Sequence, residues 1–353
     1  MALIMADSST IQASAIEAWL LGSAQIQEGP NQGGVIGWLD RDLSSRFAYG
    51  EITGYYLSYL TSPLSCSNSS QAMERALVWI RDRWIVDPRT RIYLDGNQDR
   101  DWRNAFSFSF DQVMMLRGIC NATKLVDAGL SEPIVEEMYR HLTVFVGDDG
   151  LLTPCLPIVN QSIPNRWSTQ KGPYQMKVAA VLLSVGESLP WRLRVCAENT
   201  CDHWAPFMPD VIATEELHSL LYFAEGLLLA WNTTREQRFL LRAQDILTRI
   251  SDHLEGSFQE ERVSTIVRAD VIAQTLRLTC LLDAADMKRL QWLANLLAQF
   301  IEPDGAVYFH RSVTGQLQHA NVWCGIFAAQ ALRYYSCVLQ DGCAPSAQIK
   351  WLV

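Results

Sequence analysis

The chain has 353 residues, of which 49% are hydrophobic and 19% are charged, and its formal net charge is −9. This composition supports a large hydrophobic core and excludes an intrinsically disordered or fibrous protein. The acidic balance also argues against nucleic acid or an anionic membrane surface as a partner, because both are bound by clustered Lys and Arg side chains.

The first residues of the chain and its cysteines indicate the cellular compartment in which the protein is found. Residues 1–10 have one short apolar cluster and no basic segment, which is not the pattern of a secretory signal. The most apolar stretch, 217–231, contains His218 and Glu225 and is shorter than the roughly 20 residues that span a bilayer. The nine cysteines are an odd number in apolar surroundings, as is typical of buried free thiols. We expect a cytoplasmic protein with no membrane span.

Six similar segments follow one another along the chain at intervals of about 50 to 60 residues. Each begins with an amphipathic helix, followed in most cases by a turn containing Gly or Asp with a short β-like run, and ends with a helix that is apolar nearly all round. In chain order, the predicted elements are 10–27, 33–38 and 51–60; 71–84, 91–96 and 110–125; 132–146, 149–152 and 173–185; 191–199 and 215–231; 234–253, 256–258 and 269–282; and 286–300, 304–309 and 321–335.

Helices that are apolar on nearly every side must be buried on nearly every side. Six such helices alternating with six amphipathic ones predict two concentric layers, the amphipathic helices outside. The fold class is therefore an all-α (α/α)6 toroid, and we expect residues 1–353 to form a single domain with twelve major helices. The fourth outer helix is predicted to be the shortest, because Pro190 precedes it and few residues of 196–209 have helical spacing.

The repeat resembles the (α/α)6 barrel shared by N-acylglucosamine 2-epimerases, unsaturated glucuronyl hydrolases and other carbohydrate-active families. The resemblance covers essentially the whole chain, from the hairpin with Tyr49-Gly50-Glu51-Ile52-Thr53-Gly54-Tyr55 to the one with Asn321-Val322-Trp323-Cys324. It implies sugar chemistry, with a saccharide as the substrate. In the glucuronyl hydrolases, aspartates on inner helices carry catalysis, and Asp111 is similarly placed.

In such a toroid the pocket is lined by the connecting loops and by the first turns of the inner helices. His218 passes this filter, and Tyr222 and Glu225 follow it with i, i+4 and i+7 spacing, which places all three on one face of a helix. Imidazole, phenol and carboxylate groups in one cavity can supply a base, an acid and an orienting partner. The alternative interpretation is a hydrogen-bonded cluster within the core.

Glu51 and Asp111 are a second catalytic candidate, each near the start of an inner helix. Two carboxylates across a cavity are what glycoside hydrolysis requires, one to protonate the leaving oxygen and one to activate water or attack. The alternative is that these residues only cap their helices or interact with the helix dipoles.

Further residues near the same rim are candidates for substrate binding. Aromatic faces in a concave site stack on the C–H faces of sugars, and guanidinium and ammonium groups suit an anionic substrate such as a uronate. Core packing and solvated rim charges are the alternatives. The candidates are Trp38, Tyr55, Trp102, Arg103, Trp167, Lys171, Tyr174, Arg268, Asp270, His319, Asn321 and Trp323.

The sequence predicts no metal and no cofactor. Cys196, Cys201 and His203 offer soft ligands but lack a second pair with the spacing of a zinc site. Residues 95–101 resemble the first half of a calcium loop, but Phe106 stands where a bidentate Glu is required. Phosphate-binding, dinucleotide-binding and nucleophile-elbow motifs are absent from the sequence.

These features predict an enzyme that acts on a uronate-containing or amino-sugar glycan or its fragments, by hydrolysis or by base-catalysed epimerisation or elimination. A noncatalytic saccharide-binding or scaffold protein is the first alternative, and an isoprenoid-handling toroid is the second. We expect Glu51, Asp111, His218 and His319 to surround one cavity. A cavity lined by Glu51, Asp111, His218 and Asn321 favours catalysis, whereas internal pairing of these residues favours binding.

Overall fold

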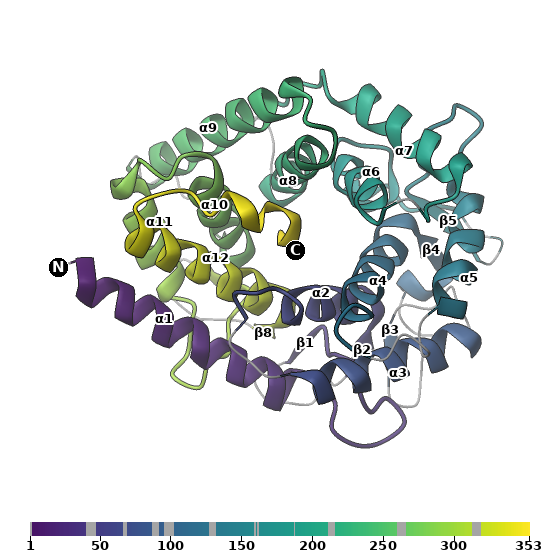
Figure 1. Cartoon of the computed structure of the whole chain (residues 1–353), viewed down its shortest axis with the longest axis horizontal. Helices are drawn as coiled ribbons and strands as arrows, with labels where there is room; N and C mark the ends of the chain where they lie inside the picture. The colour runs from purple at the N-terminus through teal and green to yellow at the C-terminus, as the bar shows by residue number, and fades with distance from the viewer. Residues whose placement is uncertain are drawn as a thin grey trace.

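In the computed structural model the chain forms two concentric rings of helices (Figure 1). The structure describes residues 2–39, 47–65, 69–86, 92–94, 102–126, 132–158, 160, 162–186, 188–210, 216–259, 266–312 and 319–353. The outer helices are α1 (Ala2–Trp19), α3 (Ser70–Val86), α5 (Glu132–Leu142), α7 (Trp191–Trp204), α9 (Gln237–Gln259) and α11 (Met287–Ala298). The inner helices are α2 (Gly50–Leu60), α4 (Ser109–Ala122), α6 (Gln175–Ser184), α8 (Leu217–Thr234), α10 (Ala269–Leu282) and α12 (Val322–Asp341).

The twelve predicted helices and the (α/α)6 toroid are thereby confirmed. Each inner helix packs against the next, α12 packs against α2, and α1 packs against α12, so the two ends of the chain close the ring. A short π-helical segment (Leu20–Ala24) continues α1, and a 3-10 turn (Thr143–Phe145) continues α5.

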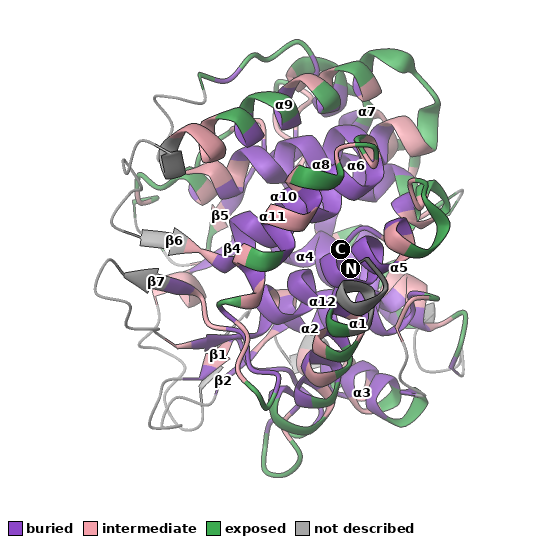
Figure 2. Ribbon diagram, turned by 90° about the vertical axis from the view of Figure 1, so that its left-hand side faces the viewer, coloured by how far each residue is buried: buried purple, intermediate pink, exposed green. Residues whose placement is uncertain are grey.

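The division into layers follows from the helix surfaces. On α9, Ala243, Ile246 and Ile250 are buried on one face, while Asp245 and Arg249 form an ion pair on the solvent side. The inner helices are buried on nearly every side (Figure 2). In the part of the chain that the structure describes, no helix is both long and apolar enough to cross a membrane.

Short antiparallel strand pairs gather on one side of the ring (Figure 2). Four of the strands lead directly into the N-terminal ends of inner helices, which places those helix starts at this end. The pairs are β1 (Trp38–Leu39) with β8 (Ala320–Asn321), β2 (Phe47–Tyr49) with β3 (Ile92–Leu94), β4 (Phe106–Phe108) with β5 (Cys155–Pro157), and β6 (Ile266–Arg268) with β7 (His310–Ser312).

Two local predictions were wrong. The predicted turn at 256–258 lies within α9, because Gly256 has open space around it and an exposed helix tolerates glycine at a cost of only about 1 kcal/mol. The fourth outer helix runs to Trp204, five residues beyond the prediction that ended at 199. Pro190 occupies its N-cap, where a missing N–H costs nothing, so the proline begins this helix instead of shortening it.

Inner helices α2 and α4 approach each other through two glycines. A Cβ atom at Gly54 would lie 2.5 Å from the backbone oxygen of Met114, and one at Gly118 would lie 2.5 Å from the backbone oxygen of Gly54. The backbones of the two helices therefore touch, and neither position has room for a side chain.

Replacing Gly54 tests this close contact. We expect Gly54→Ala to lower the free energy of unfolding by about 1 to 3 kcal/mol, because the added methyl group forces two helix backbones apart. Gly256→Ala is the matched control: it adds the same methyl group to a helix with open space and should leave stability equal or slightly higher. Chemical denaturation of both variants checks this, and equal stabilities would show that α2 and α4 are less closely packed.

Candidate functional site

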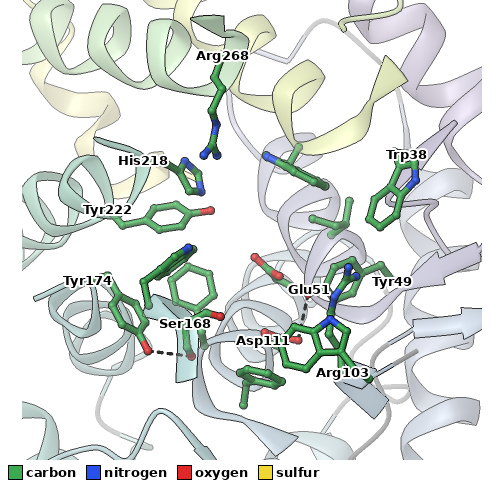
Figure 3. A pocket seen from close by; sticks show the side chains of 16 residues that line it. Trp38, Tyr49, Glu51, Arg103, Asp111, Ser168, Tyr174, His218, Tyr222 and Arg268 are labelled. Carbon is green, nitrogen blue, oxygen red and sulfur yellow. Dashed lines mark hydrogen bonds between the residues drawn. The ribbon is translucent and has the colours of Figure 1, made fainter. Parts of the chain in front are cut away.

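A pocket of about 220 Å³ opens where the strands enter the inner helices (Figure 3). It contains most of the residues predicted from the sequence, which come from segments far apart in the chain. The predicted residues that line it are Trp38, Glu51, Trp102, Arg103, Asp111, Trp167, Tyr174, His218, Tyr222, Arg268 and Trp323. Tyr49 also lines the pocket, as do four residues that were not proposed as site residues: Ile52, Phe108, Phe110 and Ser168.

Three predicted binding residues lie away from the pocket lining. Lys171 is on the surface, where its ammonium group pairs with Asp149 at 2.5 Å and lowers the pKa of that carboxyl. His319 is not one of the lining residues: its ring stacks on Phe309 with centroids 5.3 Å apart and lies 5.7 Å from the ring of Trp38, which does line the pocket. Asn321 caps α12 by accepting a hydrogen bond from the backbone N–H of Cys324, as the capping alternative describes.

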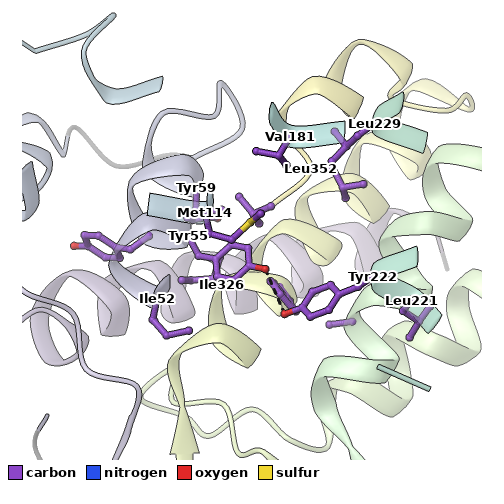
Figure 4. Packing of buried hydrophobic residues seen from close by; sticks show 14 of the residues in the cluster. Ile52, Tyr55, Tyr59, Met114, Val181, Leu221, Tyr222, Leu229, Ile326 and Leu352 are labelled. Carbon is purple, nitrogen blue, oxygen red and sulfur yellow. Dashed lines mark hydrogen bonds between the residues drawn. The ribbon is translucent and has the colours of Figure 1, made fainter. Parts of the chain in front are cut away.

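Three others lie behind the lining and support it. Tyr55 donates a hydrogen bond to the hydroxyl of Tyr222 at 3.3 Å, and its own side chain is buried (Figure 4). Asp270 and Glu225 are both fully buried and both ion-paired, so neither carboxylate reaches the pocket. For Glu225 the core-cluster interpretation describes the structure.

His218 is held through its Nδ1 atom. This nitrogen lies 2.6 Å from Gln274 Oε1 and 3.2 Å from Asp270 Oδ2. Gln274 donates its amide N–H to Glu225 at 3.2 Å, which turns its Oε1 toward His218. Because both neighbours of Nδ1 are acceptors, the ring proton is on Nδ1 and Nε2 carries the free lone pair.

The imidazole of His218 is neutral at neutral pH. Burial lowers its pKa from 6.5 to about 4, although Asp270 raises it. A neutral ring with its proton on Nδ1 is a hydrogen acceptor at Nε2, which is the form of histidine that acts as a base.

Asp270 connects His218 to Arg268. The guanidinium of Arg268 binds both carboxylate oxygens, at 3.0 and 2.6 Å, and Trp323 Nε1 lies 3.4 Å from Oδ2. Burial alone would raise the pKa of Asp270, but Arg268 and His218 lower it overall, so the carboxylate stays ionised. The charge of Arg268 is accordingly compensated within the protein.

Glu225 lies at the centre of a buried charge cluster that the sequence analysis missed. Lys177 Nζ is 2.8 Å from Oε2, and Arg277 binds Oε1. Burial would raise the pKa of Glu225, but Arg277 and Lys177 lower it overall. Burial lowers the pKa of Lys177 to about 7, although Glu225 raises it. A lysine and an arginine inside otherwise apolar helices were the available clue.

The opposite wall of the pocket carries the two predicted carboxylates, Glu51 and Asp111 (Figure 3). The hydroxyl of Tyr49 donates to Asp111 Oδ2 at 3.4 Å. Aromatic rings complete the enclosure: the ring of Phe110 lies 4.9 Å from that of Tyr222, and the guanidinium of Arg103 lies 5.4 Å from the ring of Trp38. The pocket therefore presents a base and a phenol facing two carboxylates, with aromatic faces between them.

The residues considered as metal ligands do not form a metal site in the described part of the chain. Cys196 and Cys201 are buried on α7, and burial raises the pKa of the Cys196 thiol to about 11. Among the described residues, no group of three or more His, Cys, Asp or Glu side chains could hold a metal ion. The calcium-like segment 95–101 lies outside the described part of the chain.

Comparisons with known proteins establish the fold. No protein-family model matches the chain, and no curated protein matches its sequence. Among solved structures, it is similar to an unsaturated glucuronyl hydrolase specific for heparin, with 11% identity, coverage of 95% of this chain and 96% of that chain, and a TM-score of 0.63. It is also similar to a sugar epimerase from a ruminal bacterium, with 8% identity, coverage of 96% and 99%, and a TM-score of 0.65.

A third similar structure is a type II terpene cyclase from Scytonema, with 14% identity, coverage of 96% of this chain and 98% of that chain, and a TM-score of 0.52. The resemblance to epimerase and glucuronyl hydrolase barrels is thus confirmed as a likeness of fold. At such identities the likeness does not by itself assign an activity.

The low pKa of His218 makes stability depend on pH. Between pH 6.5 and about 4, the unfolded chain takes up a proton on this imidazole and the native protein does not. The free energy of unfolding therefore falls by up to about 3 kcal/mol as the pH decreases through this window. His218→Gln should lack this part of the decrease, which denaturant unfolding of both proteins at pH 6.5 and pH 4 measures. An equal decrease in the free energy of unfolding for both proteins would show that folding does not lower the pKa of His218.

Proposed function

We propose that the protein is a carbohydrate-active enzyme that uses His218 Nε2 as the base in epimerisation or isomerisation of a sugar. The observation that carries the proposal is the fixed, neutral state of His218, with Nδ1–H held by Gln274 and Asp270 beside a pocket. Proton abstraction from the carbon next to a carbonyl needs such a base within reach of the substrate.

The chemistry can be followed through the side chains. In the open-chain form of an aldose, His218 Nε2 takes the proton from the carbon beside the carbonyl, and the C–H electron pair moves into a carbon–carbon double bond. Tyr222 donates a hydrogen bond to the carbonyl oxygen, which becomes the oxygen of an enediolate. For the epimer, His218 gives its proton to solvent, a proton from solvent adds to the same carbon from the other face, and the carbonyl re-forms. For the isomer, the enediolate oxygen takes the proton of the neighbouring hydroxyl group, the proton on His218 adds to the former carbonyl carbon, and the carbonyl forms at the neighbouring carbon.

Tyr222 suits the role of hydrogen-bond donor to the carbonyl oxygen. Burial raises its pKa well above 10, so the phenol keeps its proton. Its oxygen accepts a hydrogen bond from Tyr55, which leaves its own O–H to donate. The imidazolium formed on His218 would be stabilised by the ionised Asp270 at 3.2 Å.

The pocket walls support a sugar as substrate. Indole and phenyl faces at Trp38, Phe110, Trp167 and Trp323 can stack on sugar C–H faces, and Glu51 and Asp111 can accept hydrogen bonds from hydroxyl groups. For an anionic sugar such as a uronate, we propose that the guanidinium of Arg103, which lines the pocket, binds the carboxylate.

Hydrolysis is the second candidate function, favoured by one observation. Glu51 and Asp111 both line the pocket, so a pair of carboxylates is available for glycosidic cleavage. Three charged or ionisable groups at the wall, Glu51, Asp111 and His218, disfavour an isoprenoid substrate. The same three residues favour catalysis over saccharide binding without turnover. Asn321, the fourth residue expected in this cavity, caps α12 instead.

Deuterium exchange distinguishes these functions. We expect incubation with single aldoses and N-acetylated amino sugars in D₂O to place deuterium on the carbon beside the carbonyl of one of them, as measured by mass spectrometry and proton NMR. His218→Ala should lower this exchange by about 10²- to 10⁴-fold, the usual effect of removing a positioned base. Lys171→Met is the control, because Lys171 lies outside the pocket lining.

Two outcomes would contradict base catalysis by His218. Cleavage of an oligosaccharide with gain of water, retained in His218→Ala and lost in Asp111→Asn, would replace base catalysis by hydrolysis. Binding of sugars with neither exchange nor cleavage would support the noncatalytic saccharide-binding alternative.

A further inference from the structure

Residues 346–353 close the end of the ring that lies opposite the pocket. The chain passes there from a 3-10 helix (Ser346–Trp351) to Leu352 and Val353, which are both fully buried. Leu352 lies among side chains of inner helices, close to Val181 and Leu229 (Figure 4). The end of the chain lies over the centre of the ring in Figure 1 and away from the strand side in Figure 2. We refer to residues 346–353 as the closing segment.

The backbone of the closing segment is bound by side chains of two inner helices. Arg117 of α4 donates to the carbonyl oxygens of Leu352 and Lys350, at 2.5 and 2.9 Å. Tyr334 of α12 donates to the carbonyl oxygen of Gln348 at 3.2 Å. Arg117 lies six residues beyond Asp111 on α4, about 9 Å further along the helix axis, so these contacts are deeper than the pocket.

Gln330 of α12 connects the closing segment to the buried charge cluster. Its amide N–H donates to the carbonyl oxygen of Trp351 at 2.7 Å, and its Oε1 accepts from the backbone N–H of Val353 at 3.2 Å. The same Oε1 accepts from Arg277 Nη1 at 2.9 Å. Both hydrogen-bonding groups of this amide are therefore used, and its orientation is fixed.

From Arg277 the hydrogen bonds continue to the pocket without a break. Arg277 donates to Glu225 Oε1, Gln274 donates to the same oxygen at 3.2 Å, and Gln274 Oε1 lies 2.6 Å from His218 Nδ1. Arg277, Glu225 and Gln274 are fully buried, and Gln330 is 1% exposed. Because water does not reach these groups to replace a lost partner, each orientation depends on the next.

We infer that Gln330, held by the closing segment, is a positioning residue for His218. Without the Gln330 oxygen, Arg277 keeps its ion pair with Glu225 but loses the second acceptor that fixes its guanidinium. A displaced guanidinium moves the Glu225 carboxylate, and with it the amide of Gln274, which disturbs the contact between Gln274 Oε1 and His218 Nδ1. Asp270 then holds Nδ1–H alone, so the ring keeps its tautomer but loses its fixed position in the pocket. The consequence for catalysis rests on the proposed function, but the state of the ring is measurable without any substrate.

Nitrogen NMR of the full chain labelled with ¹⁵N-histidine tests this inference. His218 is assigned by the loss of its signals in His218→Gln. In the native protein we expect a protonated Nδ1 and an unprotonated Nε2. In Gln330→Met the Nδ1 resonance should shift and broaden, because one of the two acceptors of its N–H is displaced, while Asp270 keeps the proton on Nδ1. Where the proposed exchange reaction is observed, its rate should fall about 10- to 100-fold.

Two variants separate positioning from stability. Gln330→Glu loses the N–H that binds Trp351 but keeps an acceptor for Arg277, and should therefore retain native His218 resonances. Tyr334→Phe removes a hydrogen bond to the closing segment without breaking the path to His218, and should lower the thermal midpoint without shifting these resonances.

Native His218 resonances in a folded Gln330→Met protein would overturn the inference. If Gln330→Met does not fold, Gln330→Asn replaces it, because the shorter amide does not reach Arg277, and the same criterion applies. Failure of every sugar to exchange deuterium would contradict the proposed function and leave the NMR result standing.

Discussion

The carboxylate of Glu225 is buried at the centre of the ring, and its charge must be compensated there by neighbouring helices. Lys177 comes from α6, Arg277 and Gln274 come from α10, and their hydrogen bonds converge on two oxygen atoms. Removing a charge from water costs several kcal/mol unless it is paired and hydrogen-bonded. This requirement fixes the mutual orientation of three inner helices, and through Gln274 it fixes the imidazole of His218.

Closure of the ring brings the residues of the site together from different parts of the chain. Each repeat places the polar start of an inner helix at the strand end, so Glu51, Asp111 and His218 meet although they come from three different hairpins. The apolar bodies of the inner helices form the core beneath them. Deeper polar residues such as Lys177, Glu225 and Arg277 lie where inner helices face one another and a hydrogen-bond partner is available from a neighbouring helix.

The two layers of helices and part of the site could be predicted from the sequence. Alternation of amphipathic and all-apolar helices is a long-range pattern, and it gave the layers correctly. The predicted convergence of inner-helix starts holds for Glu51, Asp111 and His218, whereas Lys171 and His319 stand on loops whose path depends on tertiary contacts. The buried cluster was missed because a helix that is apolar all round carries no periodicity to show which face meets which neighbour.

The most direct test of this account is a neutron crystal structure of the protein at neutral pH after exchange into D₂O. The account predicts a deuterium atom on Nδ1 of His218, directed at Gln274 and Asp270, and none on Nε2. A deuterium atom on Nε2 and a bare Nδ1 would show that Gln274 presents its amide nitrogen to the ring. That result would contradict the assignment of His218 as the base.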